Sequence, residues 1–161
     1  MDTFTIIHVI ISLIAIGSGF IVLFGLLTGR RLDGWTAFFL AMTAATSVTG
    51  FFFPFYGFTP AIGVGIISLV VLAIALVARY ARHLAGAWRW IYAVSAMAAL
   101  YLNFFVLIVQ SFQKIPALKA LAPTQSEPPF LVAQVLALLL FVVLTILAAI
   151  KFRIVATTKL T

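Results

Sequence analysis

Long apolar runs separated by short polar or basic breaks are the main pattern along this chain. A helix needs about 20 apolar residues to cross a hydrocarbon core that is roughly 30 Å thick. Five runs meet that length, at residues 4–28, 35–55, 60–80, 88–112 and 129–151. The pattern therefore predicts an all-α fold, a polytopic transmembrane bundle of five helices that forms a single domain over residues 1–161.

Composition supports this class of protein. The chain is 65% hydrophobic and 8% charged, whereas a soluble domain is about a quarter charged, so these residues cannot cover a water-facing surface. With no cysteine, disulfides, thiolate metal sites and a cysteine nucleophile are excluded. The net charge of +7 comes from bases beside the spans, where they act as topology signals, and we expect no nucleic-acid partner.

The basic residues predict the orientation of the spans. Lys114 and Lys119 fall in the loop before the last span, and the other eight of the ten bases lie on the opposite side if five spans alternate: Arg30, Arg31, Arg79, Arg82, Arg89, Lys151, Arg153 and Lys159. Loops on the cytoplasmic side carry the excess of Lys and Arg. We therefore expect the N-terminus outside and the C-terminus in the cytoplasm, across a bacterial inner membrane.

Local signals mark the ends of several spans. Thr59 followed by Pro60 predicts a helix start, and Gly29 is placed to end the first helix. Aromatic residues gather at both expected boundaries, as in an aromatic belt. Those at the cytoplasmic boundary are Trp35, Trp88 and Trp90, and those at the outer boundary are Phe55, Tyr56 and Phe58.

Small and hydroxyl residues form stripes within the spans. His8, Ser12, Ala15 and Gly19 recur at helical spacing in the first span, and Thr43, Ser47 and Gly50 do so in the second. Small residues let two helix backbones approach, and hydroxyl groups bond across helices. These stripes therefore predict contacts between helices.

Amide and imidazole groups at depth need a separate interpretation, because such a group without a partner is costly in hydrocarbon. His8, Asn103, Gln110 and Gln134 all fall in the outer half of the expected bilayer. If the first, fourth and fifth spans are neighbours, these four side chains form a polar cluster. Two interpretations are open, a structural hydrogen-bond network and a ligand-binding site.

One loop differs from the rest of the chain. Its eighteen residues, 113–130 (QKIPALKALAPTQSEPPF), hold four of the six prolines. Apolar residues at helical spacing predict a short interfacial helix that ends at Pro123. The loop is then either a rigid turn or a lid over the polar cluster, with Glu127 facing His8.

Several function classes fit the sequence poorly. A haem held by two histidines within one monomer is excluded by this topology, since His8 and His83 fall on opposite sides. Asp2, Asp33 and Glu127 lie outside the spans, so proton-coupled transport has little support. No Gly-x-Ser-x-Gly, HExxH or paired carboxylate is present. We therefore expect no enzyme activity, no catalytic residue, no metal site and no cofactor.

Three segments carry a resemblance: GRRLDGWTAFFLAMTAATSVTGF, AGAWRWIYAVSAMAALYLNFFVLIVQSF and APTQSEPPF. They resemble a group of small multi-span inner-membrane proteins of Gram-negative bacteria to which no function is assigned, and the likeness spans nearly the whole chain. In span lengths and the early membrane histidine His8, the chain is more loosely similar to small multi-helix proteins of terminal-oxidase maturation.

The function expected from these observations is a non-enzymatic membrane protein that docks on a larger membrane complex as an accessory or assembly subunit. A chain with so little mass outside the bilayer offers surface for lipid, a buried ligand, another membrane protein or further copies of itself. The first alternative is a binder of a lipid-like ligand, a quinone or lipid, at His8, Asn103, Gln110, Gln134 and Glu127. Further alternatives are a single-His haem protein and a small transporter.

Overall fold

The computed structural model describes residues 2–54 and 56–158, and only the backbone of residues 153–158. Phe55 and Lys159, which entered the predicted aromatic belt and charge pattern, lie outside the described residues. The described part is helical and contains no strand. Its elements are α1 (Thr3–Leu27), α2 (Asp33–Gly50), α3 (Pro60–Leu76), the π-helical turn η1 (Val77–Ala81), α4 (Trp88–Lys114), α5 (Pro116–Leu121) and α6 (Pro128–Thr158).

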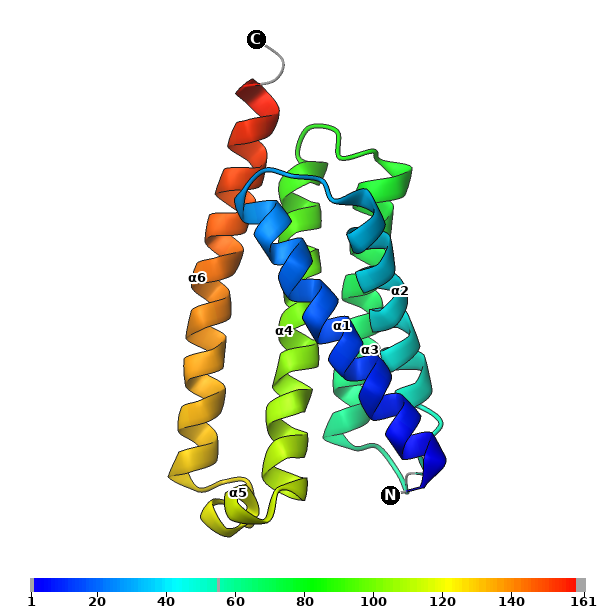
Figure 1. Ribbon diagram of the computed structural model, residues 1–161, viewed down its shortest axis with the longest axis vertical. Helices are drawn as coiled ribbons and strands as arrows, with labels where there is room; N and C mark the ends of the chain where they lie inside the picture. Colours follow the sequence, from blue (N-terminus) through cyan, green and yellow to red (C-terminus); the bar gives the residue numbers. More distant parts are fainter. Residues whose placement is uncertain (1, 55, 159–161) are drawn as a thin grey trace.

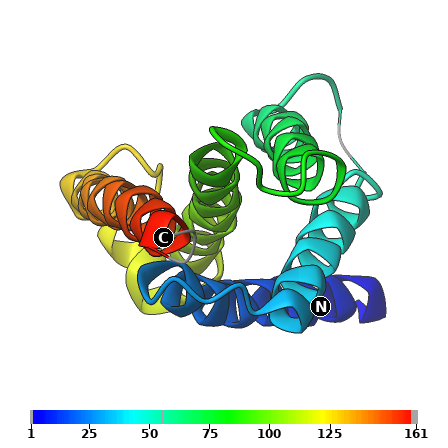
Figure 2. The same cartoon turned by 90° about the horizontal axis from the view of Figure 1, so that it is seen from above.

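Five long helices run alternately up and down in one bundle (Figure 1). Helix α1 lies obliquely across one side of the bundle, packing on α2 near its start and reaching α6 near its end (Figures 1 and 2). Helix α4 is central, because it packs against α1, α3 and α6. The short helix α5 lies at the end of the bundle opposite the C-terminus (Figure 1).

Four helical stretches are long and apolar enough to cross a membrane: α1, the continuous α3 and η1 (Pro60–Ala81), α4, and residues Pro128–Phe152 of α6. The chain is therefore an all-α membrane helical bundle. Helix α2 is not among the four. It is long enough at 18 residues, but it includes Asp33 and five Thr or Ser residues and is therefore less apolar than the four stretches. The fifth crossing stays a prediction.

Two predicted helix ends are confirmed. Gly29 follows the last turn of α1 with φ of 68°, a left-handed conformation that glycine adopts without a steric penalty. Its amide donates to the Leu26 carbonyl, and the Arg30 amide donates to the Gly25 carbonyl at 2.7 Å. This is a Schellman motif. At the start of α3 the Thr59 hydroxyl accepts from the Ile62 amide at 3.4 Å, and Pro60 follows it.

The predicted stripes of small residues lie in helix contacts. A Cβ added to Gly19 would lie 2.5 Å from Leu100 Cδ1 on α4 and 2.9 Å from Phe39 Cε2 on α2. A side chain at this position would therefore require the Leu100 and Phe39 side chains to move. Ala15 is fully buried on the same face of α1.

The structure buries a charged residue that the sequence analysis placed with the surface bases. Arg79 lies in η1, is 3% exposed and forms an ion pair with Asp33 at the start of α2. The same guanidinium donates to the Arg31 carbonyl at 3.3 Å and lies 5.1 Å from the centre of the Tyr92 ring. A buried cation needs such partners because desolvation is costly. Arg79 therefore fixes α2 against η1 and α4.

We expect Asp33→Asn to lower the free energy of unfolding in detergent by about 1–2 kcal/mol, because the buried Arg79 guanidinium loses its ionic partner. The exposed position of the Asp33 side chain, which solvent screens, keeps this effect below that of a fully buried pair. Thermal unfolding followed by far-UV circular dichroism measures the change. Arg30→Gln, an exposed loop substitution, serves as the control, and equal stability of the two variants would contradict the role given to Asp33.

Candidate functional site

His8 connects α1 to α2. Its Nδ1 lies 2.7 Å from the Thr49 hydroxyl oxygen. The Thr49 hydroxyl itself donates to the Ala45 carbonyl at 2.6 Å, so the His8 Nδ1–H is the donor in the first contact. The imidazole edge also meets the Phe53 ring, with centroids 5.0 Å apart. The polar partner of His8 therefore lies in α2. This contact is near the start of α1, the end of the helix that lies away from α6.

Two predicted amides also bond between helices. The buried Asn103 donates from Nδ2 to the Thr43 hydroxyl at 3.2 Å, which joins α4 to α2. Gln134 donates from Nε2 to the Phe105 carbonyl at 3.4 Å, which joins α6 to α4. Within the described residues, the Gln134 Oε1 is buried without a hydrogen-bond partner. Gln110 is half-buried on α4.

The five predicted site residues do not form one hydrogen-bonded cluster. In the part of the chain that the structure describes, no hydrogen bond or ion pair joins any two of them. The hydrogen bonds of His8, Asn103 and Gln134 each join two helices, as the interpretation of these residues as structural predicts. The geometry therefore favours helix packing as the role of His8 and Asn103, and ligand binding at these positions stays a prediction.

Glu127 closes a tight turn in the loop before α6. Its carboxylate accepts from the Thr124 amide, from the Thr124 hydroxyl at 2.8 Å and from the Ser126 amide at 3.1 Å. Desolvation raises the pKa of the Glu127 carboxyl, but these hydrogen bonds together lower that pKa below its usual value. The carboxylate is thus held ionised by its own loop.

The expected pairing of Glu127 with His8 is not formed. The start of α1 and the loop that carries Glu127 lie on different sides of the bundle in both views (Figures 1 and 2). The physical reason is local, because neighbouring donors within three residues satisfy the carboxylate without any movement of the chain. Within the described residues, no hydrogen bond joins the Glu127 carboxylate to α6. The Glu127 carbonyl instead accepts from the Phe130 and Leu131 amides at 3.1 and 3.2 Å.

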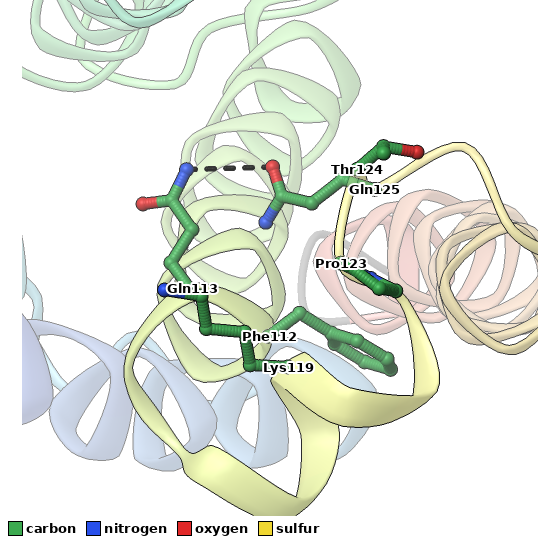
Figure 3. A pocket seen from close by; sticks show the side chains of 6 residues that line it. All are labelled: Phe112, Gln113, Lys119, Pro123, Thr124 and Gln125. Carbon is green, nitrogen blue, oxygen red and sulfur yellow. Dashed lines mark hydrogen bonds between the residues drawn. The ribbon is translucent and has the colours of Figure 1, made fainter.

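A hollow of about 270 Å³ lies beside this loop (Figure 3). It is lined by Phe112, Gln113, Lys119, Pro123, Thr124 and Gln125. None of these is among the residues predicted for the polar site. The hollow lies between the end of α4 and the 115–127 segment, so the loop does cover a concave surface, although at a different place from the one expected.

Gln125 fastens the loop to α4. Its Nε2 donates to the Val109 carbonyl at 2.9 Å, and its Oε1 accepts from Gln113 Nε2 at 3.3 Å (Figure 3). The residue has φ of 59°, a left-handed conformation that is strained for a non-glycine residue. Phe112 and Phe130 meet edge to face below it, with centroids 5.4 Å apart. These contacts favour the interpretation of the loop as a rigid turn.

Sequence reasoning missed Gln125, Arg79 and the partners of His8 and Asn103. The only available signal for Gln125 was its position in a polar turn before two prolines. Among the described residues, no group of three or more His, Asp or Glu side chains lies close enough to hold a metal ion. Comparisons with protein-family models, curated proteins and solved structures give no significant match to this chain.

We expect Gln125→Ala to loosen the loop, because the substitution removes the hydrogen bonds to Val109 and Gln113 and keeps an unfavourable positive φ. Gln125→Gly removes the same bonds but relieves the backbone strain, which for alanine costs about 1 kcal/mol or more. Limited trypsin digestion measures this through cleavage after Lys114 and Lys119. Cleavage should rise in the order wild type, Gln125→Gly, Gln125→Ala, and equal rates in all three would contradict the fastening role.

Proposed function

We propose that this chain is a five-span protein of a bacterial inner membrane, with its N-terminus outside and its C-terminus in the cytoplasm, that serves as a non-enzymatic accessory or assembly subunit of a larger membrane complex. The alternating directions of α1, α2, α3, α4 and α6 support five crossings (Figure 1). Apart from the bases in the loop between α4 and α6, the described bases lie at one end of the bundle, where α1 ends and α4 begins. Because cytoplasmic loops carry the excess of Lys and Arg, this supports placing that end in the cytoplasm.

The lower hydropathy of α2 is compatible with a crossing. Its hydroxyl residues Thr36, Thr43 and Ser47 are buried within the bundle, where other helices can satisfy them. Trp35, at 48% exposed, and other apolar side chains face outward. A bilayer would thus meet mostly the apolar face of this helix.

Helix α5 fits a position in the membrane interface. None of its residues is buried. The exposed Ile115 precedes it and the exposed Leu121 ends it, and the exposed Lys114 and Lys119 lie nearby in the sequence. Apolar side chains can enter the headgroup region there while the lysine side chains extend to water.

The observation that carries the docking proposal is the exposure of α6. In the 18-residue apolar window of α6, 11% of the residues are buried, compared with 44% in the windows of α1 and α4 and 22% in that of α3 with η1. The helix contains 31 residues, about 46 Å at 1.5 Å per residue, so it is longer than the core of a bilayer. It ends beyond the rest of the bundle (Figure 1). A long, apolar and little-packed helix is suited to contact a second membrane protein.

A cysteine pair that flanks α2 tests the crossing and the orientation, since the chain has no native cysteine. We expect a membrane-impermeant maleimide to label Tyr56→Cys in intact spheroplasts and Arg30→Cys only after permeabilisation. Both residues are exposed, and Arg30 precedes the start of α2 whereas Tyr56 follows its end. Labelling of both from the same side would remove α2 from the spans. Reversal of the two results would invert the topology.

Docking through α6 predicts that the protein is recovered from native membranes in mild detergent with a partner at a fixed stoichiometry. The double substitution Leu139→Trp and Val143→Trp places bulk on the exposed face of α6. We expect it to abolish recovery of that partner, because tight helix packing does not accept large added side chains. Quantitative mass spectrometry of the purified sample measures the ratio.

The matched control adds the same bulk to α3 by Ile67→Trp and Val70→Trp, at residues that are 53% and 56% exposed. This variant should keep the partner. Loss of the partner in the control alone would move the docking face to α3. Recovery of the wild-type chain without a partner would contradict the accessory role.

A second candidate function, a binder of a lipid-like ligand, draws support from the hollow at the end of α4. Its Phe112 floor and its amide and lysine rim combine an apolar surface with polar groups, as ligand sites commonly do. A quinone or lipid found by mass spectrometry in the same purified sample, and lost on Phe112→Ala, would favour this function over docking.

A further inference from the structure

The end of the bundle formed by residues 28–33 and 82–89 holds more guanidinium groups than its carboxylate can neutralise. Asp33 is the only acidic residue there, and it already pairs with Arg79 and, at 3.5 Å, with Arg31 Nε. Two guanidinium groups thus share one carboxylate, and the other like charges at this end repel them unless a further anion is present.

The hydrogen-bonding groups of this end are also incompletely used. Arg79 directs one terminal nitrogen to Asp33 and Arg31. Its other terminal nitrogen, Nη1, and the hydroxyl of the fully buried Tyr92 have no hydrogen-bond partner among the described residues. Asp33 therefore satisfies only part of the charge and part of the donors of the guanidinium groups around it.

Aromatic rings hold two further guanidinium groups at the rim. Arg82 lies over the Trp88 ring, 5.2 Å from its centre, and Arg89 lies over the Phe152 ring at 5.6 Å. Such stacking orients the group while its N–H donors stay available. Neither side chain has an acidic partner in the part of the chain that the structure describes, since both ion pairs there involve Asp33.

We propose that this basic end binds the phosphate group of an anionic membrane lipid, with Arg31 and Arg89 as the principal donors. A guanidinium fork matches two phosphate oxygens. Arg31 follows the end of α1 and Arg89 lies in the first turn of α4, and both helix ends terminate membrane-crossing stretches, so these side chains lie at the level of lipid headgroups. An anionic lipid there would offset the excess positive charge. This proposal requires the membrane position of the bundle but no docking partner.

Tryptophan fluorescence offers a direct test, because all three tryptophans, Trp35, Trp88 and Trp90, lie at this end. The full chain is reconstituted in phosphatidylcholine vesicles that contain a minor fraction of phosphatidylglycerol with brominated acyl chains, which quench nearby indoles. Vesicles with the same fraction of brominated phosphatidylcholine provide the reference. We expect phosphatidylglycerol to be preferred by about thirtyfold, since Arg31 and Arg89 near an anionic surface contribute about 1 kcal/mol each.

Two double variants that lose the same charge show which end of the bundle binds the lipid. Arg31→Gln with Arg89→Gln should reduce the preference to about that of phosphatidylcholine. Lys114→Gln with Lys119→Gln, at the opposite end, should leave it unchanged. Arg89→Lys keeps the charge but not the guanidinium fork, so it should keep more of the preference than Arg89→Gln and less than the wild type. Far-UV circular dichroism of each variant in phosphatidylcholine vesicles checks its fold.

Three results would overturn the proposal. The first is equal quenching of the wild-type chain by the two brominated lipids. The second is an equal loss of preference in the lysine control. The third is competition by inorganic phosphate beyond that of chloride at matched ionic strength, which would assign the site to free phosphate instead of a lipid.

Discussion

A polar group inside hydrocarbon must bond to another part of the protein, because no water is available to it. This constraint determines how the helices of this bundle meet. His8 bonds to Thr49, Asn103 to Thr43 and Gln134 to the Phe105 carbonyl. Each contact joins two helices, so the few polar side chains set which helix faces which. Where polar groups are fewer, as on α6, the surface stays apolar and is free to meet lipid or another membrane protein.

The two ends of the bundle satisfy their polar groups in different ways. At one end, Glu127 and Gln125 satisfy the backbone of a loop locally and fasten it to α4. At the other end, a buried guanidinium crosses between α2, η1 and α4, with Asp33 as its counter-ion. The π-helical turn η1 adds a residue to the helical turn around Arg79, as π-bulges often do near functional residues. The first end is polar and locally bonded, whereas the second keeps an excess of positive charge.

Helix ends and apolar lengths were predictable because they depend on neighbouring residues. The left-handed Gly29 and the Thr59 cap follow from short-range geometry. Most ends of the apolar runs lie within two residues of the helix ends, but α2 ends five residues before the second run and α6 continues seven residues past the fifth. The partners of the polar side chains were not predictable. Thr49 and Glu127 were both chemically suitable partners for His8. Only the oblique course of α1 placed the start of this helix, and therefore His8, against α2. The burial of Arg79 was likewise hidden, since a base at a span end usually faces headgroups.

The sequence alone determined the class of protein, the helical content and the position of each long helix, because apolar length and local capping need no distant residue. The tertiary structure decided which groups are satisfied and which are not. It turned the predicted outer cluster into separate contacts between pairs of helices, it held Glu127 within its own loop, and it buried Arg79 beside a single carboxylate. These outcomes depend on the angles and neighbours of packed helices, and residues far apart in the chain set those angles through contacts such as Gly19 with Leu100.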